Sequence, residues 1–293
     1  HKGITMTHKK NYLVFGAGAI GTTVAAWLND SDVNVSIFDK KEVSDHINQH
    51  GLDIYHGDDP SKRYKSRVTA YSNLDEAPTP DVIVLCIKNY SLAGVSELLT
   101  KQYGKDVLII ALQNGVENLA TLRHFCPDHE VVGGMVPFNV VNMGAGHFHQ
   151  GTSGELWFGQ GGSELVSLLN SYNLTCRYHE NIEAVHWGKL LLNLNNAINA
   201  LSDLPLKQEL SQRQYRVILS AAIREALDVY EGAEIYAKSV MRLPLAWLPN
   251  LLLLPDFIFN VVARSILAID PNARSSMWED LQKGRKTEFA DIN

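Results

Sequence analysis

The chain has 293 residues, of which 45% are hydrophobic and 20% charged, and its formal net charge at pH 7 is −6. This composition is that of a soluble globular protein, and the length is enough for two domains of ordinary size. The negative charge argues against a general binder of nucleic acid or of an anionic membrane surface. Three widely spaced cysteines, without a metal-binding pattern, are interpreted as free thiols in a reducing compartment, so we expect a cytoplasmic protein.

The first ten residues are polar and basic and contain no apolar core, so no signal peptide is predicted. The most apolar region, 243–269, is interrupted by several prolines and by Asp256 and Arg264. It therefore falls short of the roughly 20 apolar residues that a membrane span requires, and we interpret it as buried helices with a proline-rich connection. Residues 288–293 look like the inside of a helix, so we expect the natural protein to continue beyond them.

An apolar run at 12–15 leads directly into Gly16, Gly18 and Gly21, and a helix-like segment follows at 22–28. This order of strand, glycine turn and helix is the fingerprint of a dinucleotide-binding βαβ unit. The first glycine permits the tight turn, the second lets the backbone approach a pyrophosphate, and the third lets the helix pack close to the strand. The expected cofactor contacts from this loop are Gly16, Ala17, Gly18, Ala19, Ile20 and Gly21.

Strand-like and helix-like segments alternate from residue 11 to about residue 180, which predicts a mostly parallel sheet covered by helices. Strands are predicted at 12–15, 33–38, 66–71, 82–87, 107–112, 131–140 and 174–179. Helices are predicted at 19–29, 42–50, 91–102, 116–125 and 163–171. The stretch 148–159 is interpreted as a hairpin that closes this half of the chain.

After Ile182 the strand signals fade and long helical patterns take over. These patterns cover about 182–202, 208–233, 257–267 and 275–290. We therefore predict an α/β fold with a Rossmann-type dinucleotide-binding domain at 11–180 and an all-helical substrate-binding domain at 181–293.

Asp39 and Lys40 follow the second predicted strand, at the place that faces the adenosine ribose of a bound dinucleotide. An acidic residue there favours the 2′-hydroxyl of NAD, whereas a basic residue favours the 2′-phosphate of NADP. The sequence offers both and leaves the preference open, and a solvated turn without a ligand is the alternative.

Lys88 ends the nearly all-apolar segment 81–88, and Asn114 follows the next strand. Both fall at the carboxyl edge of the sheet, where ligands of open α/β folds bind. Lys88 is expected to contact cofactor or substrate, and a surface lysine with a buried stem is the alternative. Asn114 is expected to bind the nicotinamide carboxamide or the substrate, unless it only stabilises the turn at Gly115.

Lys189, Asn193 and Asn196 are spaced i, i+4 and i+7 in a leucine-rich helical segment, so they share one helix face. Burying these groups unpaired would be costly, which predicts a face that lines a cleft or, alternatively, a polar network between helices. Burial would also lower the pKa of Lys189 towards neutrality and make it a reasonable acid for a carbonyl oxygen. Ser276 begins another helical segment and is either a ligand or an N-cap. No histidine spacing indicates a metal site.

Taken in order, these motifs resemble the 2-dehydropantoate 2-reductase family, also called ketopantoate reductase. The resemblance rests on segments 16–21, 87–88, 113–115, 187–193 and 275–288, which span nearly the whole chain. It implies a Rossmann domain that binds NADPH and a helical domain like the C-terminal domain of 6-phosphogluconate dehydrogenase. It further implies hydride transfer to the ketone of a 2-keto acid, in pantothenate biosynthesis.

The resemblance implies that Lys189 protonates the developing alkoxide and that Glu288 contacts the cofactor and assists this lysine. It assigns Asn193, Ser276 and Asn114 to the substrate, and Lys40, Lys88, Asn114 and Glu288 to the cofactor. NADH stays open as an alternative to NADPH, because Asp39 precedes Lys40. The family helix often carries a second Asn eight residues after the lysine, where this chain has Ala197, and Asn196 or Asn199 is expected to replace it.

Two alternative functions stay open. One is a paralogous NAD(P)-dependent reductase of another 2-keto acid or small carbonyl compound, which Ala197 and the apolar stretch 243–269 favour. The other is a non-catalytic dinucleotide-binding protein, which the presence of Lys189, Asn193 and Glu288 argues against. The expected partner is a small 2-keto acid, with no nucleic acid and no membrane, and the apolar stretch makes a homodimer a candidate assembly.

Overall fold

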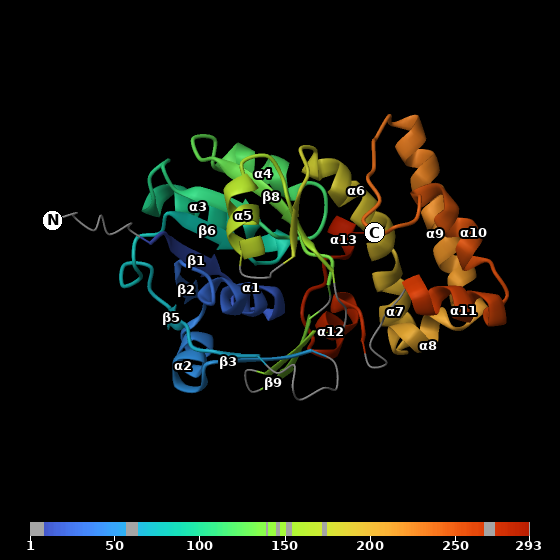
Figure 1. The fold of residues 1–293 in the computed structure, drawn as a ribbon, viewed down its shortest axis with the longest axis horizontal. Helices are drawn as coiled ribbons and strands as arrows, with labels where there is room; N and C mark the ends of the chain where they lie inside the picture. Colours follow the sequence, from blue (N-terminus) through green and yellow to red (C-terminus); the bar gives the residue numbers. More distant parts are fainter. Residues whose placement is uncertain are drawn as a thin grey trace.

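The computed structural model describes residues 9–56, 64–138, 140–144, 147–150, 154–171, 175–266 and 273–292. Figure 1 shows a part built on a sheet, in blue to yellow-green, and a part built on helices, in yellow to orange. The two short C-terminal helices, in red, lie between them. This arrangement is the mixed α/β fold with a helical C-terminal part that the sequence predicts.

The strands of the main sheet are β1 Asn11–Phe15, β2 Asn34–Phe38, β5 Thr69–Tyr71, β6 Val82–Leu85, β7 Leu108–Ala111, β8 Val131–Met135, β11 Leu156–Phe158 and β12 Cys176–Tyr178. Their order across the sheet is β12-β11-β8-β7-β6-β1-β2-β5. All neighbouring pairs from β5 to β8 are parallel, and only the pairing of β11 with β8 is antiparallel. The prediction of a mostly parallel sheet is confirmed.

The direction of chain progress across the sheet reverses between β1 and β6. From β1 the chain proceeds through β2 to β5 on one side, and then through β6, β7 and β8 on the other. At such a reversal the loops after the two adjacent strands diverge and leave a crevice at their carboxyl ends. Here these loops begin with Gly16 and Cys86, which directly follow β1 and β6.

Helices cover both faces of the sheet, which explains why its central strands are apolar throughout. On β1, Tyr12 and Val14 belong to the core on one face, whereas Leu13 and Phe15 belong to the core on the other. The first face is covered by α1 Ala19–Asn29 and α5 Ser163–Ser171. The second is covered by α3 Leu92–Gln102, α4 Asn118–Phe125 and α6 Ile182–Asn193.

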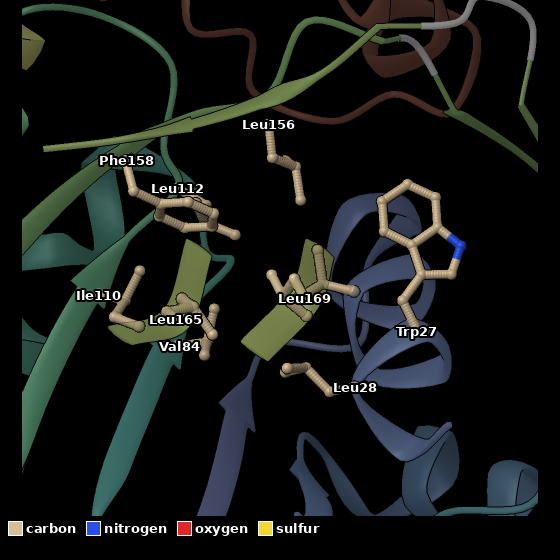
Figure 2. A pocket seen from close by; sticks show the side chains of 10 residues that line it. Trp27, Leu28, Val84, Ile110, Leu112, Leu156, Phe158, Leu165 and Leu169 are labelled. Atoms are coloured by element: carbon tan, nitrogen blue, oxygen red, sulfur yellow. The ribbon is translucent and has the colours of Figure 1, made fainter. Parts of the chain in front are cut away.

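Figure 2 shows the packing beside α1, where Leu169 of α5 lies between Trp27 on one side and Leu165 and Val84 on the other. The small space between them is lined by Val24, Trp27, Leu28, Val84, Ile110, Leu112, Leu156, Phe158, Leu165 and Leu169. Every one of these side chains is aliphatic or aromatic, so a charged or strongly polar ligand has no partner there. This space is part of the core and not a candidate site.

A second, four-stranded sheet was not predicted. Its strands are β3 Leu52–His56, β4 Tyr64–Ser66, β9 Val140–Gly144 and β10 His147–Gln150, in the order β4-β3-β10-β9. The predictions at 66–71 and 131–140 are therefore wrong in extent. The first contains the end of β4 and all of β5, the second contains all of β8 and the start of β9, and residue 139 lies outside the described residues. An alternating apolar pattern looks the same in either sheet, and only the pairing partner distinguishes them.

The predicted hairpin at 148–159 is also wrong. β10 pairs with β9 and β3 in the small sheet, while β11 pairs with β8 and β12 in the large one. Gly154, the described glycine between β10 and β11, therefore belongs to a connection between two sheets. Residues 151–153 of the predicted hairpin, and residue 174 of the predicted strand 174–179, lie outside the described residues.

Beyond β12 the described residues contain helices as their only regular elements. They are α6 and then α7 Asn195–Ser202, α8 Leu206–Leu210, α9 Arg213–Gly232, α10 Leu248–Leu252, α11 Asp256–Ile266, α12 Ser276–Gln282 and α13 Phe289–Ile292, with a short 3-10 turn at Leu245–Trp247. In the N-terminal part, α2 Lys41–His50 follows β2, and a 3-10 turn at Asn89–Ser91 precedes α3. Within the described ranges, no helix has the length and apolar character that crossing a bilayer demands.

Three helices predicted as continuous are interrupted, so these predictions are wrong in extent. The segment 182–202 breaks at Leu194, 208–233 falls into α8 and α9, and 275–290 falls into α12 and α13. In the first two segments the apolar periodicity runs on across the break, because Leu191 and Ile198, and likewise Leu210 and Leu219, face the same core. Periodicity reports the buried face and not the continuity of the backbone.

Residues 267–269 of the apolar stretch lie outside the described residues, and its described part, 243–266, packs around Arg216 of α9, whose side chain is fully buried. Its guanidinium donates to the carbonyl oxygens of Leu252 at 2.9 Å and Leu254 at 2.8 Å, and it pairs with Asp256. It also lies 4.0 Å from the ring centre of Phe259. The buried guanidinium of Arg216 thus binds the end of α10 and the start of α11 to α9.

Within 243–266, the interpretation as buried helices holds for one face only. Leu248, Leu252 and Phe259 are buried against α9, but Phe257 and Val261 on α11 are 74% and 68% exposed. α11 therefore carries apolar side chains on both its covered and its uncovered face.

Arg216→Met is expected to lower the free energy of unfolding by about 2–3 kcal/mol, because two buried carbonyl groups lose their donor. Arg224→Met is the matched control, since Arg224 is an exposed residue of the same helix and its change is expected to stay within about 0.5 kcal/mol. Urea unfolding of both variants measures the difference. Equal losses in the two variants would contradict this account of the segment.

Candidate active site

The glycine loop after β1 has the geometry that each glycine predicts. Gly16 has a φ of +103°, and a Cβ there would lie 2.8 Å from the carbonyl oxygen of Cys86. A Cβ on Gly21 would overlap the carbonyl oxygen of Gly16, so the helix packs directly on the turn. Around Gly18, by contrast, no atom lies within 4 Å of the Cβ position. Two glycines are needed for packing, and the third opens the backbone to a ligand.

The start of α1 reinforces this cradle. The helix begins at Ala19, its N-cap is Gly18, and no side chain caps it. The backbone N–H groups of its first turn are thus without a side-chain acceptor, and the helix dipole adds partial positive charge. Open space over Gly18 and an uncapped helix start together fit a pyrophosphate group.

Asp39 directly follows β2 and lies against the glycine loop. One of its carboxylate oxygens accepts a hydrogen bond from the backbone N–H of Ala17 at 2.6 Å, and the other from that of Lys40 at 2.7 Å. Lys40 itself is exposed and stands at the N-cap position of α2. The tertiary structure therefore brings the predicted ribose-facing residues to the same end of the sheet as the loop.

Lys88 follows β6 and bridges two carboxylates from the C-terminal helical segments. Its Nζ lies 2.7 Å from Asp280 of α12 and 3.2 Å from Glu288, just before α13. The other oxygen of Glu288 accepts the backbone N–H of Asn89 at 2.9 Å. Asp280 and Glu288 are 1% and 6% exposed. Lys88 thus forms a long-range ion pair within the chain and is not a solvated surface lysine.

Burial would lower the pKa of Lys88, but the charges of Glu288 and Asp280 outweigh it and raise this pKa above the ordinary value. Lys88 consequently stays charged over the physiological range. Arg285 donates to the second oxygen of Asp280 at 2.9 Å, so both carboxylates are fully paired.

Lys189 lies on α6, where its partly buried Nζ donates to the carbonyl oxygen of Val136, just past the end of β8. Burial lowers the pKa of Lys189 to about 8, although the nearby charge of Glu288 acts in the opposite direction. A narrow pocket next to this amine is lined by Gln113, Asn114, Gly115, Met135, Val136, His186, Lys189 and Asn193. The pocket combines a lysine that can give up a proton near neutral pH with two asparagine amides.

Asn114 reaches this pocket from the end of β7. The turn that Gly115 predicts is present, with a φ of +93°. The backbone carbonyl of Asn114 accepts a hydrogen bond from the Asn89 side chain at 2.6 Å. Asn89 thereby links the loop after β7 to the loop after β6, where Glu288 is bound.

The structure does not bring every predicted site residue into the pocket. Asn196 lies on α7, beyond the break at Leu194, and is not among the lining residues. Asn199 is fully buried and is bound to Glu209, Leu204 and the backbone of Ser275. Asn199 therefore belongs to a polar network between helices and not to the pocket.

Ser276 is the first residue of α12 and is not its cap. The N-cap is Ser275, whose Oγ accepts the backbone N–H of Trp278 at 3.1 Å. The N-cap interpretation of Ser276 is therefore wrong by one position. Ser276 remains a partly buried hydroxyl on the helix that carries Asp280.

Sequence reasoning missed Gln113, His186, Asn89 and Asp280. Gln113 and His186 are 5% and 4% exposed and line the pocket. The Nε2 of His186 lies 2.9 Å from the carbonyl oxygen of Gly134, and burial lowers the pKa of this imidazole. His186 stands three residues before Lys189 and so shares its helix face, a signal that was available. The position of Asp280 had no local signal, because its partner Lys88 is 192 residues away.

Comparison with known proteins agrees with this geometry. The family model for ketopantoate reductase PanE/ApbA matches residues 12–163, and the model for the C-terminal part of the same enzymes matches residues 181–293. The chain belongs to the ketopantoate reductase family. This family consists of dinucleotide-dependent oxidoreductases.

Individual relatives are distant. A 2-dehydropantoate 2-reductase of Halobacterium salinarum is 22% identical over 96% of this chain and 89% of its own length. The crystal structure of a PanE/ApbA family ketopantoate reductase from Ralstonia eutropha aligns with a TM-score of 0.78 at 22% identity, over 96% and 88% of the two chains. D-mandelate dehydrogenase, in a ternary structure with NADH and anilino(oxo)acetate, aligns with a TM-score of 0.79 at 18% identity, over 96% and 89%. The fold of this ketopantoate reductase family member is therefore shared with enzymes of different substrates.

Lys189→Met is expected to stabilise the protein at pH 7 by about 1–2 kcal/mol, because folding no longer buries a charged amine; the lost hydrogen bond to Val136 offsets part of the gain. Between pH 8 and the ordinary lysine pKa of 10.5, the unfolded chain binds this proton and the folded chain does not. Wild-type stability therefore rises with pH in this window, and the advantage of the variant shrinks.

Urea unfolding of wild type and variant at pH 7 and pH 10 measures this difference. The exposed Lys101→Met is the matched control and should show no pH-dependent difference from wild type. A gain in the free energy of unfolding of Lys189→Met that stays constant from pH 7 to pH 10 would contradict the lowered pKa of Lys189.

Proposed function

We propose that this member of the ketopantoate reductase family reduces ketopantoate to pantoate, with a reduced nicotinamide dinucleotide as the hydride donor and Lys189 as the general acid. The observation that carries the proposal is the partly buried amine of Lys189, with a pKa near 8, in one pocket with Asn114 and Asn193. NADPH is the donor that the family resemblance implies. A place in cytoplasmic pantothenate biosynthesis follows from the same family membership alone.

We propose the domain boundary near residue 180, between β12 and α6. The family models that match 12–163 and 181–293 support it, as does the start of the helical part at Ile182. The Rossmann-type domain at 11–180 would then hold the dinucleotide, and the helical domain at 181–293 would supply Lys189, Asp280 and Glu288.

Binding of the dinucleotide falls to the glycine loop and the ends of the neighbouring strands. Gly18 and the first turn of α1 would hold the pyrophosphate, because the backbone there is open and rich in N–H donors. Asp39 and Lys40 would face the ribose, and Lys88 and Asn114 would lie towards the nicotinamide end. The bound cofactor supplies the hydride, and the protein supplies its placement and the proton.

Lys189 would donate a proton from Nζ to the oxygen of the ketone as negative charge develops on it. The carbonyl of Val136 accepts one of the ammonium hydrogens and thereby orients the group, leaving the other hydrogens for the substrate. Asn193, four residues further along α6, and Asn114 would orient the substrate by their amides. Glu288 adds negative charge near Lys189, which favours the protonated amine before transfer.

A second candidate is reduction of a different 2-keto acid. The amide expected to replace the family's second Asn is not supplied, because Asn196 lies outside the pocket lining and Asn199 is committed to Glu209. No amide from α7 is thus present in the pocket lining, which favours a substrate with fewer hydrogen-bonding groups than ketopantoate. Turnover of NADPH and NADH with ketopantoate and with a panel of 2-keto acids separates the two candidates.

Lys189→Ala is expected to lower kcat by about 10²–10⁴-fold, the usual contribution of a general acid. Binding of the dinucleotide should persist, because the glycine loop is untouched. In wild type, kcat should fall as the pH rises through about 8, since Lys189 must be protonated to act. Stopped-flow absorbance of the reduced nicotinamide measures both effects, and cofactor fluorescence measures binding.

The exposed Lys101→Ala is the control for loss of one positive charge and should retain full turnover. Unchanged turnover in Lys189→Ala would remove this lysine from the mechanism. Tight dinucleotide binding without turnover of any keto acid by wild type would support the non-catalytic alternative instead.

A further inference from the structure

Asp39 is held more firmly than a residue at the end of a strand usually is. Each of its carboxylate oxygens accepts one backbone N–H, from Ala17 of the glycine loop at 2.6 Å and from Lys40 at 2.7 Å. The backbone N–H of Asp39 itself donates to the carbonyl oxygen of Tyr71 at 3.1 Å. The carboxylate is therefore placed by the sheet and the loop together, with little freedom to turn away from a ligand.

This position is the one at which NADH and NADPH differ. β2 is the parallel neighbour of β1, so the residue after β2 lies next to the loop that holds the pyrophosphate. The adenosine ribose of a dinucleotide bound to such a loop extends past the end of β2. Its 2′ position carries a hydroxyl in NADH and a phosphate with nearly two negative charges in NADPH.

A carboxylate oxygen that has accepted one hydrogen bond still has a lone pair for another. A ribose hydroxyl can donate to it, whereas a phosphate can only bring further negative charge. The N–H of Ala17 strengthens this discrimination against a 2′-phosphate, because it fixes the carboxylate beside the loop at which the dinucleotide would bind.

The cations nearby compensate this charge poorly. Lys41 is paired with Asp45 at 2.8 Å, one turn further along α2. Lys40 is exposed at the helix start, where a long side chain loses conformational freedom on pairing and is screened by salt. The fixed, partly buried carboxylate therefore dominates over the flexible, exposed ammonium.

We propose that Asp39 is a specificity-determining residue that makes NADH, and not NADPH, the preferred dinucleotide of this chain. The inference rests on the proposed function, since it presupposes a dinucleotide on the glycine loop. The family resemblance implies NADPH instead. The proposed preference for NADH depends on the carboxylate of Asp39 in this chain, which the shared fold does not determine.

The dissociation constants of NADH and NADPH for the full chain, measured by calorimetry, test the proposal without any turnover. Wild type is expected to bind NADH at least about tenfold more tightly. Asp39→Asn keeps an oxygen for the N–H of Ala17 but removes the charge, and should shift the ratio towards NADPH by about tenfold. Lys40→Ala should weaken NADPH binding further.

Asp32→Asn is the matched control, because Asp32 is an exposed aspartate just before the opposite end of β2, where it pairs with Lys9. The ratio of the NADH and NADPH dissociation constants of this variant should equal that of wild type. Tighter binding of NADPH than of NADH by wild type would overturn the inference, and so would an unchanged ratio in Asp39→Asn. Failure of wild type to bind either dinucleotide would instead reject the proposed function, and the inference with it. If Asp39→Asn does not fold, the wild-type ratio still decides.

Discussion

The ion pair of Lys88 with Asp280 and Glu288 is the interaction on which the site depends. It joins the end of β6 to segments that follow about 190 residues later in the chain, with Nζ–O distances of 2.7 and 3.2 Å. Removal of this cation from two buried carboxylates would be destabilising, so the pairing helps to hold α12 and α13 against the end of β6. Once they are there, the carbonyl oxygen of Asp291 comes within 3.1 Å of the Cβ position of Gly115, and the loop after β7 is covered.

The same cluster gives two neighbouring lysines opposite properties. Lys88 has two carboxylate partners, which raise its pKa and keep it charged. Lys189 has a carbonyl partner and only the more remote charge of Glu288, so burial prevails and its pKa falls to about 8. One lysine therefore acts as a permanent structural cation, and the other can exchange a proton near neutral pH. Burial affects both amines, and the number of adjacent carboxylates decides the outcome.

The parallel sheet explains how distant segments meet. Asp39, Gly16, Lys88, Asn114 and Val136 each follow a different strand, and those strands are consecutive neighbours in the order β2-β1-β6-β7-β8. Carboxyl ends of parallel strands open at one edge, so the five loops form a continuous row. α6 crosses this row at β8, where His186 and Lys189 contact the carbonyl groups of Gly134 and Val136. The helical part thereby presents its lysine to the edge at which the glycine loop lies.

The sequence by itself determined the features that are local. The glycine loop, the doubly buried strands, and the shared face of Lys189 and Asn193 all follow from spacings of a few residues, which the backbone geometry of turns, strands and helices translates directly. Only the tertiary structure decided the pairing of Lys88 with Asp280 and Glu288, the assignment of strands to two sheets, the break at Leu194 and the orientation of Asp39. Each of these depends on a partner far along the chain, and apolar periodicity carries no information about which partner that is.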